Sequence, residues 1–265
     1  MPPLVQYLEA LRKSFDAAAA SYDSVNDTLA QRVHAFVNRS RIVQALESRP
    51  VSTVLDAGGG TGTWAILLAD MGLDVTLVDI SPASVRVALQ KAHARGVKLK
   101  ALVANLEKLE LSSSSFDFIL SQGPLSLTPR PDSMLAEMHR VLKPGGLLWA
   151  EFYNAPGWAL ENTDLGFKHR VSMADETVIQ MADWDYPARL FSIRRVHQMC
   201  QNAELKVLKL YGSHVMMSSL GHERAYAHQV HAEELEQLKA MELELGTRAD
   251  CIGMSKIVQV LATRS

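Results

Sequence analysis

The stretch that most constrains the fold runs from residue 51 to residue 79 and reads VSTVLDAGGGTGTWAILLADMGLDVTLVD. A short apolar run predicts a buried strand, and the three consecutive glycines and Gly62 that follow it predict a sharp turn. The segment WAILLADMG has helical spacing and ends at Gly72, a typical C-terminal stop. A second apolar run then ends in Asp79. Strand, glycine turn, helix and strand in this order predict a nucleotide-binding βαβ unit.

Each part of this unit suits a nucleotide for a physical reason. Glycines let a ligand approach the main chain, and the helix N-terminus that follows offers free N–H groups to an anion. An acid about 20 residues further on can accept hydrogen bonds from a ribose diol. The candidate cofactor-binding residues here are Asp56, Gly58, Gly59, Gly60, Gly62, Asp79 and Ile80.

The spacing of the glycines leaves more than one nucleotide open. A dinucleotide fingerprint is G-x-G-x-x-G, whereas this chain has G-x-G-x-G through Gly58, Gly60 and Gly62. The tighter spacing disfavours a nicotinamide-dependent enzyme. That reading and a catalytically silent nucleotide-binding protein remain the alternatives from another functional class.

Composition places the chain among ordinary globular proteins. It has 265 residues, 48% of them hydrophobic and 21% charged, with a net charge of −2, so no overall basic field indicates nucleic acid. Cys200 and Cys251 fit no metal spacing, and we expect no metal site. Nothing resembles a signal peptide and no apolar run approaches about 18 residues, which predicts a cytoplasmic protein that does not span a membrane. The sequence does not fix the oligomeric state.

The pattern along the chain predicts a single α/β domain with a doubly wound, Rossmann-like sheet of seven strands, the last antiparallel beside the fifth. We expect a helical N-terminal cap over residues 1–50, a cofactor-binding core over 51–152, a substrate lid over 153–190, and the remainder of the sheet over 191–265. The expected strands are 54–55, 75–78, 99–103, 116–120, 147–152, 206–210 and 256–262. The expected helices after the cap are 64–72, 82–95, 132–142, 192–202 and 222–245, and the cap itself contains a second helix over 28–47.

Polar residues just past two further strands add to the candidate cofactor site. Asn105 and Leu106 follow the third strand, where the amide is placed for an adenine amine and the leucine for the ring. Gln122 follows the fourth strand, at the carboxyl edge where open α/β sheets bind ligands.

Other residues are candidates for contact with the substrate. Tyr153 and Asn154 directly follow the fifth strand, and we take them as the candidate catalytic residues. The candidate substrate-binding residues are Tyr22 and Arg32 in the cap and Trp158, Arg170 and Tyr186 in the lid, where Arg170 could pair with a carboxylate or phosphate.

The motifs DAGGGTG, FDFIL and RVLKPGG, together with Asp79, resemble those of class I S-adenosylmethionine (SAM) methyltransferases over residues 50–152. VLDAGGGTG, DIS, FYNAPG, DYP and LELGTR resemble bacterial tRNA 5-carboxymethoxyuridine methyltransferases over almost the whole length. The resemblance implies SAM as cofactor, S-adenosylhomocysteine as product, and cofactor contacts at Gly59, Gly60, Asp79 and Asn105–Leu106. Ser24 stands where the tRNA family has an arginine.

Two acceptors therefore compete. We expect methyl transfer to an O or N nucleophile of a small molecule, possibly a carboxylate, and the alternative is the 5-carboxymethoxyuridine carboxylate of tRNA. A carboxylate needs no general base, whereas a hydroxyl or ammonium does. Clustering of Arg39, Arg41, Arg170, Arg194 and Arg195 near the pocket mouth would favour tRNA, and their pairing with acids would favour a small molecule.

Overall fold

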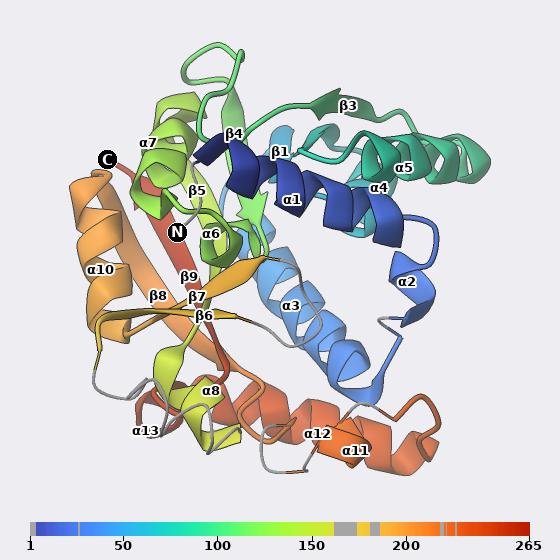
Figure 1. The fold of residues 1–265 in the computed structure, drawn as a ribbon, viewed down its shortest axis with the longest axis vertical. Coiled ribbons are helices and arrows are strands. Elements are labelled where there is room, and N and C mark those ends of the chain that lie inside the picture. Colours follow the sequence, from blue (N-terminus) through green and yellow to red (C-terminus); the bar gives the residue numbers. More distant parts are fainter. Residues whose placement is uncertain are drawn as a thin grey trace.

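A seven-stranded sheet organises the molecule, with strand order β3-β2-β1-β4-β5-β9-β8 (Figure 1). The computed structural model describes residues 4–25, 27–161, 174–180, 186–217, 220, 222–225 and 227–265. The strands are β1 Thr53–Ala57, β2 Asp74–Asp79, β3 Lys100–Val103, β4 Phe116–Ser121, β5 Leu142–Tyr153, β8 Leu205–Ser213 and β9 Ile257–Arg264. β1 to β5 are parallel, and β9 lies antiparallel between β5 and β8. The predicted seven-stranded fold with an antiparallel last strand is confirmed.

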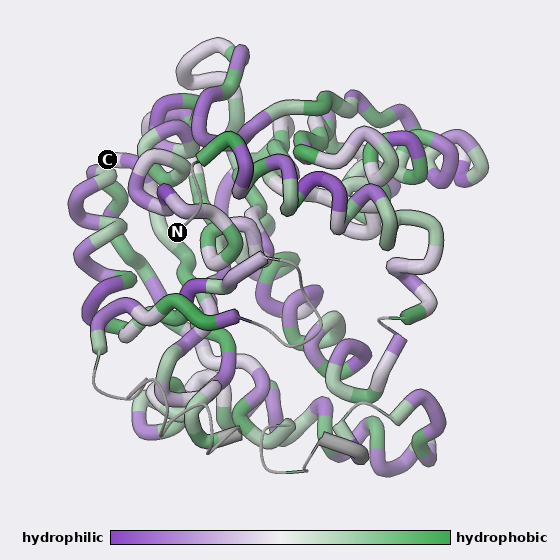
Figure 2. Tube along the Cα trace, viewed as in Figure 1, coloured by the Kyte–Doolittle hydropathy of each residue, from purple (hydrophilic) through white to green (hydrophobic). Residues whose placement is uncertain are grey.

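Helices cover both faces of this sheet. α3 Leu29–Glu47, α4 Thr63–Asp70 and α5 Pro82–Arg95 pack on one face, and α7 Pro131–Val141 and α10 Ile193–Asn202 pack on the other. Along the tube in Figure 2, peripheral helices such as α1 Leu4–Ala18 alternate between hydrophilic and hydrophobic residues, as expected of helices with one buried face. The remaining helices are α2 Tyr22–Val25, α6 Pro124–Leu127, α8 Ala155–Glu161, α11 His222–Ala225, α12 Ala232–Leu245 and α13 Ala249–Ile252. Among the described residues, no helix is both long enough and apolar enough to cross a bilayer.

Local sequence signals explain where several helices begin and end. The side chain of Thr28 accepts from the backbone N–H of Gln31 at the start of α3. Ser81 caps α5 in the same way, with Pro82 in the first turn, and Gly96 ends that helix with φ +76°. The predicted starts of both helices are therefore confirmed.

A buried polar network attaches α3 to the sheet. Asn38 on α3 and Gln259 on β9 both donate to Oε1 of Glu151 on β5, over 2.9 and 2.8 Å. Arg41 donates to the side chain of Gln259 and to the carbonyl oxygen of Gly212, over 2.7 and 2.9 Å. Glu151 is 4% exposed, and these donors replace the water that its carboxylate has lost.

Three segments differ from the sequence-based expectation. The expected lid contains α8 and a second, two-stranded sheet of β6 Glu176–Gln180 and β7 Pro187–Phe191, which irregular periodicity had hidden. The single helix expected over 222–245 is wrong, because α11 ends at Ala225 and α12 begins at Ala232. β5 begins at Leu142, five residues earlier than expected, with a register shift against β4.

Candidate functional site

The glycine turn after β1 is held in a tight conformation by its own backbone. The N–H of Gly58 donates to the carbonyl oxygen of Val78 over 2.7 Å, and the N–H of Gly62 donates to that of Gly59 over 2.9 Å. Gly58, Gly60 and Gly62 have φ of +80°, +53° and +81°, a region that favours glycine. A Cβ on Gly60 would meet nothing within 4 Å, so the main chain there faces open space.

Asp79, at the end of β2, is the acid that contacts this turn. One of its carboxylate oxygens accepts from the N–H of Gly60 and the other from the N–H of Ser81, each over 2.9 Å. Asp79 is 9% exposed, and this burial raises the pKa of its carboxyl although two N–H groups donate to it. Each oxygen keeps a further lone pair with which to accept from a ligand hydroxyl.

Asp56 lies beneath the turn rather than in front of it. Burial, with Asp79 nearby, raises its pKa to about 7. A Cβ on Gly59 would stand 2.5 Å from Oδ2 of Asp56, so the turn packs directly on this carboxyl. Asp56 therefore supports the glycine turn from below.

A cavity opens at the carboxyl edge of the parallel strands, in front of the turn. The turn, Asp79 and Asn105 contribute polar atoms to its lining, and α1, α6 and α7 contribute mainly apolar side chains. The lining residues are Leu8, Leu11, Phe15, Tyr22, Gly58, Gly60, Thr61, Asp79, Ile80, Ser84, Ala104, Asn105, Leu106, Gln122, Gly123, Pro124, Leu127, Thr128, Met134 and Tyr153.

Two carboxylates fasten the N-terminal helices over this cavity. Asp16 on α1 accepts from Oγ of Ser81 over 2.7 Å and from the N–H of Ala83 over 3.1 Å, at the start of α5. Asp23 on α2 accepts from Oγ1 of Thr61 in the glycine turn and from Nζ of Lys91, each over 2.6 Å. The cap is thereby attached to the glycine turn and to α5.

Side chains of α1 and of the β6–β7 hairpin hold two residues of the lining, Leu127 and Thr128, in place. The hydroxyl of Tyr7 on α1 lies 2.8 Å from the carbonyl oxygens of both Leu127 on α6 and Pro187 on β7. Nε of Arg189 on β7 donates to the carbonyl oxygen of Thr128 over 2.8 Å, and its guanidinium pairs with Glu176 on β6. The β6–β7 hairpin is thus connected to two lining residues.

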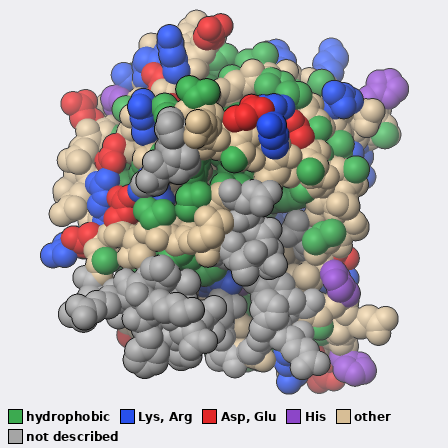
Figure 3. All heavy atoms as spheres, in the orientation of Figure 1, with side chains coloured by type: hydrophobic (Ala, Val, Ile, Leu, Met, Phe, Trp, Pro, Cys, Tyr) green, Lys and Arg blue, Asp and Glu red, His purple; other side chains and the backbone are tan. Residues whose placement is uncertain are grey.

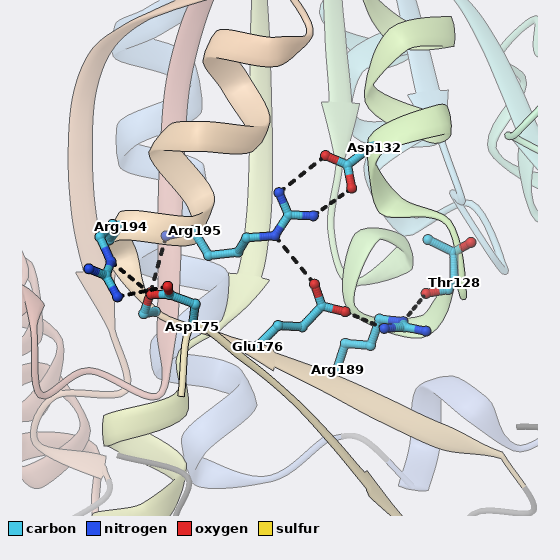
Figure 4. A network of polar contacts seen from close by, with 8 residues as sticks. Thr128, Asp132, Asp175, Glu176, Arg189, Arg194 and Arg195 are labelled. Carbon is cyan, nitrogen blue, oxygen red and sulfur yellow. Dashed lines mark hydrogen bonds and ion pairs between the residues drawn. The ribbon is translucent and has the colours of Figure 1, made fainter. Parts of the chain in front are cut away.

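An ion-pair network continues from this hairpin to the neighbouring helices (Figure 4). Arg195 on α10 pairs with Asp132 on α7 over 2.6 Å and with Glu176 over 3.3 Å. Arg194 pairs with Asp175 over 2.7 Å. Both arginines are therefore engaged by acids of the same chain.

Many of the residues singled out in the sequence meet at this cavity. Gly58, Gly60, Asp79, Ile80, Asn105, Leu106, Gln122, Tyr22 and Tyr153 all line it. Oδ1 of Asn105 also accepts from the N–H of Glu107 over 3.0 Å, which orients the amide. Asp56, Gly59 and Gly62 support the turn without lining the cavity, and a Cβ on Gly62 would stand 2.7 Å from that of Ala88.

The remaining candidates lie elsewhere. Asn154 is buried outside the lining, and its amide donates to the carbonyl oxygens of Gly253 and Ser255 over 3.0 and 2.7 Å. Arg32 pairs with Asp27 over 2.7 Å, away from the lining.

The lid aromatics pack around the cavity instead of lining it. Trp158 packs on Tyr153 with ring centroids 5.3 Å apart, and Tyr186 packs on Phe15 with centroids 5.7 Å apart. Arg170 lies outside the described residues.

Sequence reasoning missed most of the apolar lining. Leu8, Leu11 and Phe15 are visible in the sequence as the apolar face of a helix, but nothing in that pattern says that the face meets a cavity. Pro124 and Leu127 belong to the short α6, whose four residues carry no periodic signal, and Thr128 directly follows it.

Comparison with known proteins gives a match within the core of the sheet. Residues 54–146 match the family model described as a methyltransferase domain. The ubiquinone/menaquinone biosynthesis C-methyltransferase UbiE of Rubrivivax gelatinosus is 33% identical over 152 residues, which are 57% of this chain and 59% of that protein. UbiE of Shewanella oneidensis is 34% identical over 148 residues, 54% of this chain and 58% of that protein. The chain thus spans about three-fifths of the length of these curated relatives.

Solved structures share the fold over a larger part of the chain. The 1,6-didemethyltoxoflavin-N1-methyltransferase of Burkholderia thailandensis, solved with S-adenosylhomocysteine bound, has a TM-score of 0.64 at 16% identity, covering 100% of this chain and 92% of that one. A SAM-dependent methyltransferase of Thermotoga maritima, described as a possible histamine N-methyltransferase, has a TM-score of 0.61 at 20% identity, covering 96% and 99%. At these identities the likeness shows the fold.

Proposed function

We propose that this chain, which carries a class I SAM-dependent methyltransferase domain, transfers the methyl group of SAM to an oxygen or nitrogen nucleophile of a small molecule. The family match over residues 54–146 supports the reaction class and the cofactor. The curated relatives are C-methyltransferases by name, so the kind of atom methylated is part of the proposal.

The observation that carries the proposal is the pairing of Asp79 with the glycine turn inside one cavity. Asp79 accepts from the N–H of Gly60, and both residues line the cavity. A Cβ placed on Gly60 would meet nothing within 4 Å, so a ligand has room against the main chain there. An acid at the end of the second strand suits a ribose diol, and Asn105 and Leu106 at the end of the third suit an adenine. These residues fit the adenosine part of SAM.

A small acceptor is supported over tRNA by the state of the arginines. Arg41 is buried in the network under α3, and Arg194 and Arg195 pair with acids. Basic and acidic side chains are also interspersed on the coloured part of the face in Figure 3. Three of the five arginines named in the sequence are therefore taken up within the chain, which favours a small acceptor over a phosphate backbone.

The chain contributes mainly by position. When bound, SAM supplies a methyl group activated by a positively charged sulfonium. The cap closes over the cavity through Asp16 and Asp23, which limits water, and the apolar wall orients the acceptor. Among the described lining residues there is no His, Lys or Glu to act as a general base, so we expect an acceptor that is already nucleophilic.

Calorimetric titration of the purified protein with SAM and, separately, with NAD tests the proposal. We expect micromolar binding of SAM and no response to NAD. Binding of NAD alone would instead identify a nicotinamide-dependent protein. If SAM binds but no methylated product forms from a panel of small acceptors or from tRNA, the protein is a SAM-binding protein without catalysis.

A further inference from the structure

We propose that the acceptor is an uncharged, mainly apolar molecule and that Gln122 recognises it by donating a hydrogen bond to one of its oxygens or ring nitrogens. The inference rests on the proposed methyltransferase function. It narrows that function to a class of substrate. It also assigns Gln122 to contact with the acceptor, whereas its position after β4 had made it a candidate for contact with the cofactor.

The charge of the lining is the first argument. Among the described residues that line the cavity, Asp79 is the one whose side chain ordinarily ionises below about pH 9, and there is no Lys, Arg or His. The described lining offers a carboxylate or phosphate no cationic side chain in exchange for its lost hydration, so the sulfonium of SAM would be its sole cationic partner there. An anionic acceptor is therefore disfavoured, including the carboxylate that the tRNA resemblance implies.

The apolar side chains of the lining are the second argument. Leu8, Leu11 and Phe15 of α1 line the cavity together with Leu127 of α6 and Met134 of α7. Aliphatic and aromatic walls of this kind bind ligands mainly through buried apolar surface, and a few polar groups then set the orientation. The acceptor should be correspondingly apolar.

Gln122 is the polar group placed to set that orientation. Its Nε2 is buried and has no hydrogen-bond partner in the part of the chain that the structure describes. A buried N–H without an acceptor destabilises the protein, and a ligand atom that accepts from it relieves this cost.

The position of Gln122 in the sheet favours the acceptor over the ribose as its partner. Gln122 follows β4, and β1 lies between β4 and β2, which carries Asp79. Because neighbouring strands are roughly 4.8 Å apart, the end of β4 lies about 10 Å from the end of β2, and Gln122 directly precedes Gly123 and α6. An amide donor there can bond a carbonyl oxygen, an ether oxygen or a ring nitrogen.

Binding of three probes of the same shape to the protein saturated with S-adenosylhomocysteine tests the inference. The probes are 2-acetylnaphthalene, 2-ethylnaphthalene and 2-naphthoate, which carry a neutral oxygen, no oxygen and a carboxylate on one ring system. Fluorescence titration gives their dissociation constants. We expect the ketone to bind roughly threefold to tenfold more tightly than the hydrocarbon, as one hydrogen bond predicts, and at least about tenfold more tightly than the carboxylate.

The variant Gln122→Leu should remove the advantage of the ketone over the hydrocarbon and leave the affinity for S-adenosylhomocysteine within about twofold of wild type. Gln201→Leu makes the same substitution at an exposed position of α10 and should change neither. Tighter binding of 2-naphthoate, or no binding of the ketone to protein that binds S-adenosylhomocysteine, would overturn the inference and leave the proposed function standing. Loss of S-adenosylhomocysteine affinity in Gln122→Leu would return Gln122 to the cofactor. Failure of wild type to bind SAM would reject the proposed function itself.

Discussion

The close packing of the glycine turn against α6 gives a sharp test of how the cofactor end is built. Gly58 has φ +80°, and a Cβ placed on it would stand 2.1 Å from Cγ of Pro124. Gly72, at the end of α4, has φ +87° and would meet nothing within 4 Å. Gly58→Ala and Gly72→Ala therefore both place an alanine in a left-handed conformation. Only Gly58→Ala also makes the new Cβ collide with Pro124.

The expected losses follow from these two contributions. A left-handed conformation costs an alanine about 1–2 kcal/mol in either variant. The pyrrolidine ring of Pro124 cannot rotate away, so Gly58→Ala adds overpacking of about 1–3 kcal/mol. The difference between the two variants should therefore be about 1–3 kcal/mol, or roughly 2–10 °C in melting temperature for a chain of this size.

Urea unfolding of both variants at 25 °C measures this difference, and calorimetric titration measures their affinity for SAM. We expect Gly58→Ala to weaken SAM binding because both Gly58 and Pro124 line the cavity, whereas Gly72→Ala leaves it unchanged. Equal losses of stability would refute the close approach of the turn to α6. Unchanged SAM affinity in Gly58→Ala would refute the placement of the cofactor against this turn.

Three further predictions follow from individual side chains. Asp79→Ala should weaken SAM binding by about 1.5–3 kcal/mol, roughly 10- to 150-fold in Kd by calorimetry, and an unchanged Kd would contradict the ribose contact. The pKa of Asp56 is raised from 3.8 to about 7 by burial, so the unfolded chain releases this proton at lower pH than the folded chain does. The free energy of unfolding should consequently fall as pH rises from about 4 to about 7, by up to about 1.4 kcal/mol per pH unit, and then level off. Urea unfolding across this range should show a smaller fall in Asp56→Asn, and an identical pH profile would argue against a buried neutral acid. Tyr7→Phe removes the hydroxyl shared by Leu127 and Pro187 and should cost about 0.5–1.5 kcal/mol of unfolding free energy, whereas no loss would show that the shared hydrogen bond does not stabilise the fold.

The sequence predicts the cofactor half of the molecule well because its signals are local. Strand, glycine turn and helix follow one another directly between residues 53 and 79, and the acid that closes the unit is 19 residues from Gly60. The order of the strands and the antiparallel β9 likewise follow from a periodic pattern and from the fold class that it indicates. Six of the cofactor candidates, with Gln122 as a seventh, accordingly meet at one cavity: Gly58, Gly60, Asp79, Ile80, Asn105 and Leu106.

The rest of the cavity escapes prediction because its contacts are long-range. Asn154 directly follows β5 and looks exposed to a ligand in the sequence, but the loop before β9 supplies two carbonyl oxygens that take up its amide. Leu127 and Thr128 carry no chemical signal of their own. They line the cavity because Tyr7 and Arg189 hold them there.

The shared hydroxyl of Tyr7 has a consequence for the order in which the pocket assembles. The cofactor turn closes on Asp79 across 19 residues, whereas Tyr7 reaches Leu127 across 120 and Pro187 across 180. Closing the longest of these loops costs about 2 kcal/mol more chain entropy than closing the shortest. We therefore expect the wall of the cavity around Leu127 and Thr128 to form last when the chain folds and to open first when it fluctuates. Substrate range can then change by substitution in the late-forming wall, while the early-forming turn continues to hold the cofactor.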